Sequence, residues 1–310
     1  MKKTLLLCCL ILETVLAQFS DDAGKTYFNF VRLNPVPQAA AMGKLAVADS
    51  DNAPMTALNP ASLAFLENRI VFTGWQQITD GIHQGMVAGG MPWREVHHFW
   101  LGMQYLSYGE IDGRDEMGVS TGNLSAGDFA LSCYYGRKIG AKWAWGLGAM
   151  FMYSSLDGLN ASGLGLNGGL IFQSDANGAF GLSLLNMGLV LSKFHKDDAP
   201  RLPFLAAIGW SKPLAHLPVV PSITLSKGEG SPSTAHIGLN VKLVPAMNVR
   251  LGYYASLEDK IRFSNDETNR HGFTYGLDMR YRQYALSVAF LPFGKIGVME
   301  QKQFAFSYNF

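Results

Sequence analysis

The sequence has little cysteine, little charge and no long apolar run beyond its start. Two of its three cysteines, Cys8 and Cys9, lie in the first apolar stretch, which leaves Cys133 without a partner for an intrachain disulfide. Charged residues make up 16% of the chain, below the ~25% of ordinary soluble domains. A formal net charge of +1 gives no basic bias for nucleic acid. No apolar run after Ala17 approaches the ~20 residues of a transmembrane helix, which excludes a helical membrane protein.

The start of the chain has the parts of a secretory signal peptide. Lys2 and Lys3 precede an apolar run over Leu5–Leu16, and Val15–Ala17 stands before the expected cleavage point. The run is too short to cross a bilayer as a helix. We therefore expect residues 1–17 to be cleaved during export.

Glycine and aromatic residues are abundant, with 34 glycines and 12% aromatic residues. From Arg69 onward, apolar and polar residues alternate in segments of about ten residues separated by turn residues, which is the pattern of transmembrane β-barrel strands. The predicted strands are Ile70–Gln77, Ile82–Gly90, Phe99–Tyr108, Gly127–Gly136, Trp143–Tyr153, Ser162–Phe172, Ala179–Met187, Leu202–Lys212, Val219–Lys227, Ala235–Val244, Met247–Ala255, Gly272–Arg282, Tyr284–Phe290 and Gln303–Phe310. They predict an all-β fold, a transmembrane antiparallel β-barrel of about 14 strands over residues 69–310.

The residue types on the two faces of these strands indicate what each face contacts. We expect the polar faces to line the lumen with Asn240, Lys242, Asp278, Arg280 and Arg282. The tryptophans in and beside the strands are expected in belts at the membrane interfaces. The larger connections are predicted at Glu110–Ser125, Leu189–Arg201, Leu257–Arg270 and Pro292–Gln301.

The final strand places four aromatic side chains on one face: Phe304, Phe306, Tyr308 and Phe310. On a soluble sandwich, the alternative, such a stripe lies on an edge prone to aggregation. In a closed barrel one face meets lipid and closure removes the edge. The strand is therefore predicted to close a barrel in the cell outer membrane, in contact with outer-membrane lipids.

Residues 18–68 do not follow the strand pattern. Gln38–Gly43 predicts a short helical turn closed by Gly43, and Asn59-Pro60 predicts an N-cap followed by proline at the first helical position. We expect this segment to form an N-terminal plug, or hatch, with small helices. A barrel of about 14 strands is wide enough to hold one.

The sequence contains no well-formed motif for nucleotide binding, metal binding or catalysis. Gly163–Gly168 matches G-x-G-x-x-G but lies inside a predicted strand rather than between a strand and a helix. His97 and His98 are expected in a solvated turn, and the acidic stretch Glu110–Glu116 lacks the ligand spacing of a calcium loop. No serine, histidine and carboxylate stand at a spacing that predicts a nucleophilic triad. The sequence predicts no enzyme, no cofactor, no metal site and no nucleic-acid partner.

The N-terminal motifs resemble those that open the PorV/PorQ family. They are Gln38–Gly43, with Met42 and Gly43; Val47–Ala53, with Asp51 and Asn52; and Leu58–Ala64, with Asn59, Pro60 and Ala61. Lys44 departs from the family, which usually has a second glycine there. The resemblance implies a barrel of the FadL type, with fourteen strands and an N-terminal plug. The final strand likewise resembles the terminal strand that the barrel assembly machinery recognises in outer-membrane barrels.

This resemblance implies a component of type IX protein secretion whose loops bind the translocon, cargo or surface attachment proteins. The alternative is a FadL-like channel for fatty acids or other hydrophobic small molecules, with residues 18–68 as its gate and a hydrophobic ligand in its lumen.

Overall fold

The computed structural model describes residues 26–50, 53–94, 96–114, 116–175, 177–257, 271–293 and 299–310. The expected signal peptide, and Asp51 and Asn52 of the resemblance, lie outside the described residues. The strands are β1 Ile70–Thr79, β2 Ile82–Trp93, β3 His97–Ser107, β4 Ile111–Arg114, β5 Ser120–Leu124, β6 Ala126–Ile139, β7 Trp143–Leu156, β8 Leu159–Ser174, β9 Gly178–Ser192, β10 Leu205–Ser211, β11 Val219–Gly228, β12 Ser231–Val244, β13 Met247–Ser256, β14 His271–Tyr281, β15 Tyr284–Phe293 and β16 Met299–Asn309.

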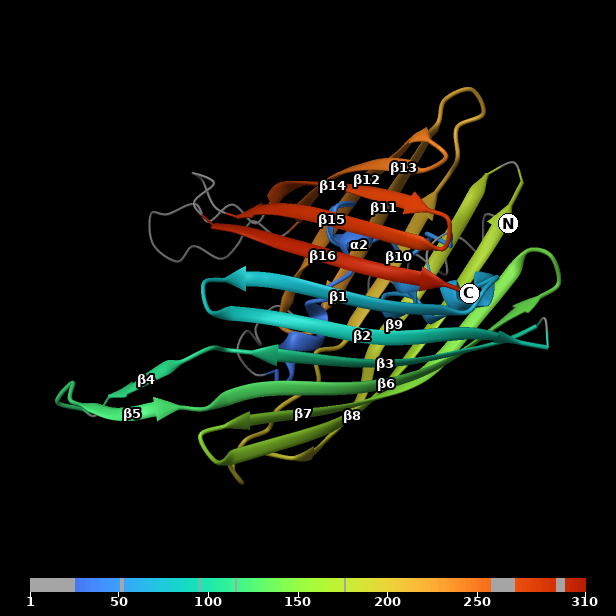
Figure 1. The fold of residues 1–310 in the computed structure, drawn as a ribbon. Coiled ribbons are helices and arrows are strands. Elements are labelled where there is room, and N and C mark those ends of the chain that lie inside the picture. Colours follow the sequence, from blue (N-terminus) through green and yellow to red (C-terminus); the bar gives the residue numbers. More distant parts are fainter. Residues whose placement is uncertain are drawn as a thin grey trace.

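Fourteen of these strands form a closed antiparallel barrel (Figure 1). Each pairs with its neighbour along the chain, except that β3 pairs with β6 and the barrel closes where β1 pairs with β16. The closing register runs from Ile70 opposite Asn309 to Gln77 opposite Lys302. The predicted fold class and strand number are confirmed.

The two ends of the barrel differ in their connections. At one end, here called the short-turn end, few residues join β2 to β3, β6 to β7, β8 to β9, β12 to β13 and β14 to β15. At the other, here called the long-connection end, residues 193–204 join β9 to β10 and residues 257–270 join β13 to β14. Bacterial outer-membrane barrels place their short turns in the periplasm.

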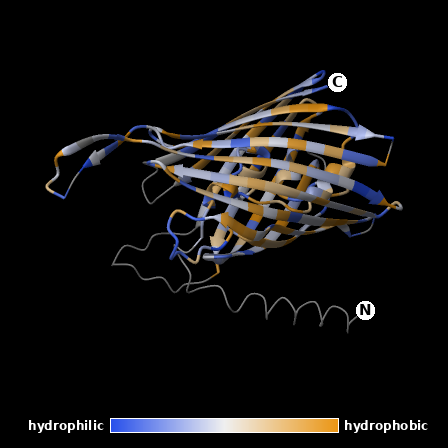
Figure 2. Ribbon diagram, turned by 90° about the horizontal axis from the view of Figure 1, so that it is seen from below, coloured by the Kyte–Doolittle hydropathy of each residue, from blue (hydrophilic) through white to orange (hydrophobic). Residues whose placement is uncertain are grey.

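The outer face of the barrel is apolar. Large hydrophobic side chains alternate with buried ones along each strand, and Leu101, Leu147 and Leu166 are each more than half exposed. Figure 2 shows hydrophobic segments recurring along the barrel strands. An apolar outer wall of paired strands suits a bilayer, where strand edges need hydrogen-bond partners.

The lumen holds the N-terminal segment. It contains the 3-10 helices η1 (Asn29–Arg32), η2 (Ala53–Ala57) and η3 (Pro60–Phe65), and the α-helix α2 (Pro37–Ala40). Figure 1 shows this blue segment within the ring of strands. None of the helices in the described part of the chain is long and apolar enough to cross a membrane.

Four details differ from the sequence-based expectations. Residues 111–124, expected as an external loop, form the separate two-stranded sheet β4–β5, which projects beyond the barrel (Figures 1 and 2). Strand β9 continues to Ser192, so the connection after it begins later than predicted. His98 is not in a solvated turn but buried within β3, because it faces the lumen. Trp100 is 1% exposed and also faces the lumen, so it does not belong to an interface belt.

Candidate functional site

The plug, defined here as residues 26–66, fits the barrel through inward-facing glycines. A Cβ added to Gly146 of β7 would lie 2.2 Å from the carbonyl oxygen of Pro60, and one added to Gly181 of β9 would lie 2.2 Å from that of Val47. At Gly252 of β13 the distance to the backbone nitrogen of Gly43 would be 2.0 Å. These separations leave no room for any side chain, so the glycines let the plug backbone lie directly against the wall.

Glutamines on the wall hold the first part of the plug. Gln84 of β2 donates to the carbonyl of Phe30 at 3.1 Å, and Gln104 of β3 donates to that of Leu33 at 2.9 Å. Gln303 of β16 donates to the carbonyl of Asn34 at 3.3 Å. These buried amides bind backbone carbonyls of the plug directly to the wall.

The start of the plug is fastened to the connection between β9 and β10. The backbone nitrogen of Tyr27 donates to the carbonyl of Arg201 at 3.0 Å, and the Tyr27 hydroxyl donates to the Asp198 carboxylate. Burial, helped by this carboxylate, raises the pKa of Tyr27 to about 12, so the hydroxyl keeps its proton. The plug therefore begins at the long-connection end of the lumen.

The first motif of the resemblance makes a turn against the wall. Met42 is buried, and Gly43, at φ 77°, donates its backbone N–H to Thr274 at 3.0 Å. Lys44 has φ 80°, the left-handed conformation that suits glycine, and its ammonium lies 3.9 Å from the centre of the Tyr254 ring. The turn thus keeps a backbone suited to glycine although a lysine occupies it.

The Asn59-Pro60-Ala61 motif begins η3 as the sequence predicts. The Asn59 side chain accepts a hydrogen bond from the backbone of Ala61 at 3.0 Å and donates to the carbonyl of Val47 at 2.6 Å. Asn59 therefore caps η3 and joins two passes of the plug.

The four aromatic residues of the final strand lie away from the plug. Phe304, Phe306 and Phe310 are exposed on the outer face, while Gln303, Ala305 and Ser307 between them are buried on the inner face. Phe304 packs against Trp75 of β1 across the closing seam, with ring centres 5.9 Å apart. This strand contributes to the wall, and the plug supplies the interior.

A buried ion cluster, which the sequence did not predict, links the plug to the wall. The side chain of Arg250 on β13 is 2% exposed and pairs with Asp278 on β14 and, at 3.5 Å, with Asp49 of the plug. Its guanidinium also lies 3.1 Å from the sulfur of Met42. Arg250 is buried on the inward face of β13, and no local signal in the sequence indicated its partner Asp49, which is 201 residues away.

The β9 cleft is a cavity of about 650 Å³ at the long-connection end. Because β10 pairs with β9 only as far as Leu185, the remainder of β9 has no neighbour on that side among the described strands. Seven of the twelve described lining residues are apolar: Met187, Leu189, Val190, Ala199, Pro200, Leu202 and Phe204. The wall is thus interrupted where the plug begins.

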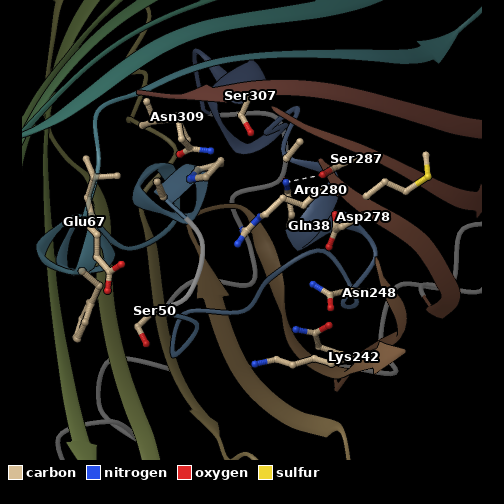
Figure 3. A pocket seen from close by; sticks show the side chains of 18 of the residues that line it. Gln38, Ser50, Glu67, Lys242, Asn248, Asp278, Arg280, Ser287, Ser307 and Asn309 are labelled. Atoms are coloured by element: carbon tan, nitrogen blue, oxygen red, sulfur yellow. Dashed lines mark hydrogen bonds between the residues drawn. The ribbon is translucent and has the colours of Figure 1, made fainter. Parts of the chain in front are cut away.

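The vestibule is a second cavity, of about 860 Å³, that lies between the plug and the wall at the short-turn end. It is lined by Gln38, Ser50 and Glu67 of the N-terminal segment and by residues of the wall that include Lys242, Asn248 and Arg280 (Figure 3). Four of the five residues predicted to line the lumen, Lys242, Asp278, Arg280 and Asn240, border it from β12 and β14, and Arg282 borders it from the turn after β14. The five residues therefore line the lumen, as the sequence predicts, and the structure gathers them around one cavity.

The described residues contain no grouping of three or more His, Cys, Asp or Glu side chains that would hold a metal ion. The Gly163–Gly168 motif lies within β8 and pairs with β7 along its length and with β9 at every position except Asn167. The candidate functional features are therefore the β9 cleft, the vestibule and the plug.

Comparison with solved structures places the barrel among known folds. The toluene transporter TodX of Pseudomonas putida has a TM-score of 0.64 and 13% identity, over 94% of this chain and 99% of that one. The toluene transporter TbuX of Ralstonia pickettii has a TM-score of 0.60 and 13% identity, over 88% and 98%. A FadL homologue of Pseudomonas aeruginosa has a TM-score of 0.57 and 10% identity, over 88% and 97%.

No protein-family model matches the sequence, and no curated protein does. At 10–13% identity the structural likeness is one of fold. The chain therefore has the fourteen-stranded barrel fold of these toluene transporters and of the FadL homologue.

Proposed function

We propose that this protein is an outer-membrane channel for hydrophobic small molecules and that such molecules enter through the β9 cleft. The apolar outer wall suits a bilayer, and the likeness in fold to toluene transporters supports the choice of cargo. With its short turns in the periplasm, the cleft lies on the outer side of the membrane.

The observation that carries this proposal is the interrupted wall at β9. A molecule in the cleft meets mostly apolar side chains and lies beside the start of the plug, where Tyr27 contacts Arg201. Burial of apolar surface in such a cleft contributes roughly 25 cal/mol per Å². A shift of the plug connects the cleft to the remainder of the lumen.

Cells tested for uptake of radiolabelled toluene, with and without this protein, test the proposal. We expect Ala199→Trp, which fills the cleft, to reduce the protein-dependent uptake several-fold. Ala141→Trp, in the exposed turn after β6, is the matched control and leaves uptake unchanged. Uptake that does not depend on the protein, or that Ala199→Trp leaves unaltered, contradicts the proposal.

The second candidate is the type IX secretion role implied by the PorV/PorQ resemblance. The β4–β5 hairpin favours it, because the hairpin projects from the long-connection end with Met117 88% and Val119 61% exposed near its tip. This role predicts that proteins with type IX C-terminal domains disappear from the medium and surface of cells that lack the gene. An unchanged extracellular proteome rejects it.

A further inference from the structure

The vestibule has a chemistry opposite to that of the β9 cleft. Its described lining is rich in amide, hydroxyl and charged groups, contributed by the plug, by the walls of β12–β16 and by β6 and β8. Figure 3 shows Lys242 and Asn248 on one side of the cavity, Ser50 and Glu67 across from them, and Arg280 beside Gln38 and Ser287. An apolar molecule gains nothing from these groups, because it would remove water from them without replacing the hydrogen bonds.

The described lining of the vestibule carries an excess of positive charge. Arg250 is paired with Asp278 and Asp49, and this group of one cation and two carboxylates carries a net charge of −1. The remaining charged side chains are four cations, Lys138, Lys242, Arg280 and Arg282, and one anion, Glu67. Neither Arg280 nor Arg282 makes an ion pair with any described residue. Cations gathered in a concave site with low-dielectric walls attract and concentrate an anion.

In the same lining, two buried amides each have an oxygen without a hydrogen-bond partner. Gln38 is 7% and Asn240 6% exposed, and the Gln38 Oε1 and Asn240 Oδ1 atoms have no partner. The Gln38 Nε2 atom donates to the Ser287 hydroxyl at 2.7 Å, so either orientation of this amide leaves one polar atom unsatisfied. A ligand hydroxyl group can donate or accept, and it therefore fits both orientations. A buried polar atom left unpaired is costly, which favours a ligand that pairs with it.

We propose that the vestibule is a binding site for an anionic sugar of about monosaccharide size that enters from the short-turn end. Its phosphate or carboxylate group binds Arg280, and its hydroxyl groups pair with the amides of Gln38 and Asn240, whose shielded oxygens reach the ligand by rotation of the side chains. The volume of about 860 Å³ lies within the range of small-molecule sites and leaves room for the bound water that such ligands retain. This function is separate from the passage of hydrophobic molecules.

Titration calorimetry on the purified full chain in detergent tests the proposal. The probes are glucose 6-phosphate and glucuronate, compared with glucose, which lacks the charge, and inorganic phosphate, which lacks the sugar hydroxyls. We expect at least one of the two anionic sugars to bind at least tenfold more tightly than either reference compound, with an affinity that falls as salt rises. Whichever of the two sugars binds more tightly shows whether the site prefers a phosphate or a carboxylate.

Variants separate the charge from the hydroxyl contacts. Arg280→Gln and Asn240→Leu are each expected to weaken binding about tenfold, whereas Arg137→Gln, an exposed position on β6 outside the cavity, leaves binding unchanged. Heat-modifiable migration on gels confirms that each variant still forms a closed barrel. No binding of either sugar, equal binding of phosphate alone, or full binding by Arg280→Gln overturns the proposal. Toluene uptake by Arg280→Gln cells stays normal if the channel proposal holds, so the two proposals fail separately.

Discussion

At the scale of single residues, the inward glycines decide whether the plug fits. Gly252→Val would place its Cβ 2.0 Å from the Gly43 backbone nitrogen, so the plug must move. Overpacking of this kind typically costs about 1–3 kcal/mol, and backbone on both sides leaves little room to relax. We expect trypsin to cleave the variant at Arg32 or Lys44 while the barrel stays closed. Gly89→Val is the control, because its Cβ meets nothing nearer than the Ile70 carbonyl oxygen at 3.7 Å; equal protection of both variants contradicts the close fit.

Arg250 is the single cation between two carboxylates. Arg250→Met removes the guanidinium that both Asp49 and Asp278 contact, which we expect to cost about 3–5 kcal/mol in the free energy of unfolding. The measurement is denaturant unfolding in lipid vesicles. Adding Asp278→Asn to this variant recovers part of the loss, because it removes one unpaired carboxylate. A loss below 0.5 kcal/mol, the range of ordinary surface substitutions, is incompatible with the cluster.

Lys44 gives the plug a pH dependence. Burial lowers the pKa of Lys44 to about 8, whereas the unfolded chain keeps the ordinary value of 10.5. Between these values the unfolded state holds a proton that the folded state has released, so this residue makes stability rise as pH increases from about 8 to about 10.5. Below pH 8 both states are protonated and the dependence disappears. We expect Lys44→Met to flatten the rise when thermal unfolding is followed across this range; an unchanged slope excludes Lys44 as its source.

At the scale of elements, the sequence predicted all fourteen barrel strands because a two-residue period repeats wherever one face meets lipid. Within the segment 18–68 it also predicted the short helices at Gln38–Gly43 and after Asn59. It missed the β4–β5 hairpin, whose two strands have only 4 and 5 residues and carry Gly113 and Gly122. It missed Trp100 in the lumen, because composition does not show which face a tryptophan occupies. It could not pair Asp49 with Arg250, because that contact depends on how the plug turns.

The role of the β4–β5 hairpin can be tested separately from the stability of the barrel. Strands β4 and β5 pair only with each other among the described strands, and β3 and β6 pair directly beneath them. Replacing residues 111–124 with a short glycine–serine linker is therefore expected to leave the melting temperature and toluene uptake of the barrel unchanged. If the secretion role holds, the same deletion abolishes co-purification of surface partners. A barrel that no longer folds without the hairpin contradicts its structural independence.

At the scale of the whole molecule, the apolar outer wall determines which surroundings, lipid or water, stabilise the barrel. Phe304 lies near the middle of β16, is 41% exposed and packs beside Trp75. We expect Phe304→Lys to cost about 2–4 kcal/mol in lipid, because a charge near the bilayer centre loses its water. Phe310→Lys, at the short-turn end, costs less than about 1 kcal/mol. Equal effects in lipid vesicles show that Phe304 does not face the bilayer core.

The plug touches every one of the fourteen strands, from Pro35 against Gly74 of β1 to Asn34 against Gln303 of β16. It is joined to β1 by only residues 67–69 and precedes every strand along the chain. During biogenesis each strand can thus gain an inner contact as it joins the sheet, and β16, the last, closes the cylinder around an interior that is already occupied. An open, empty pore is therefore not a required intermediate of assembly.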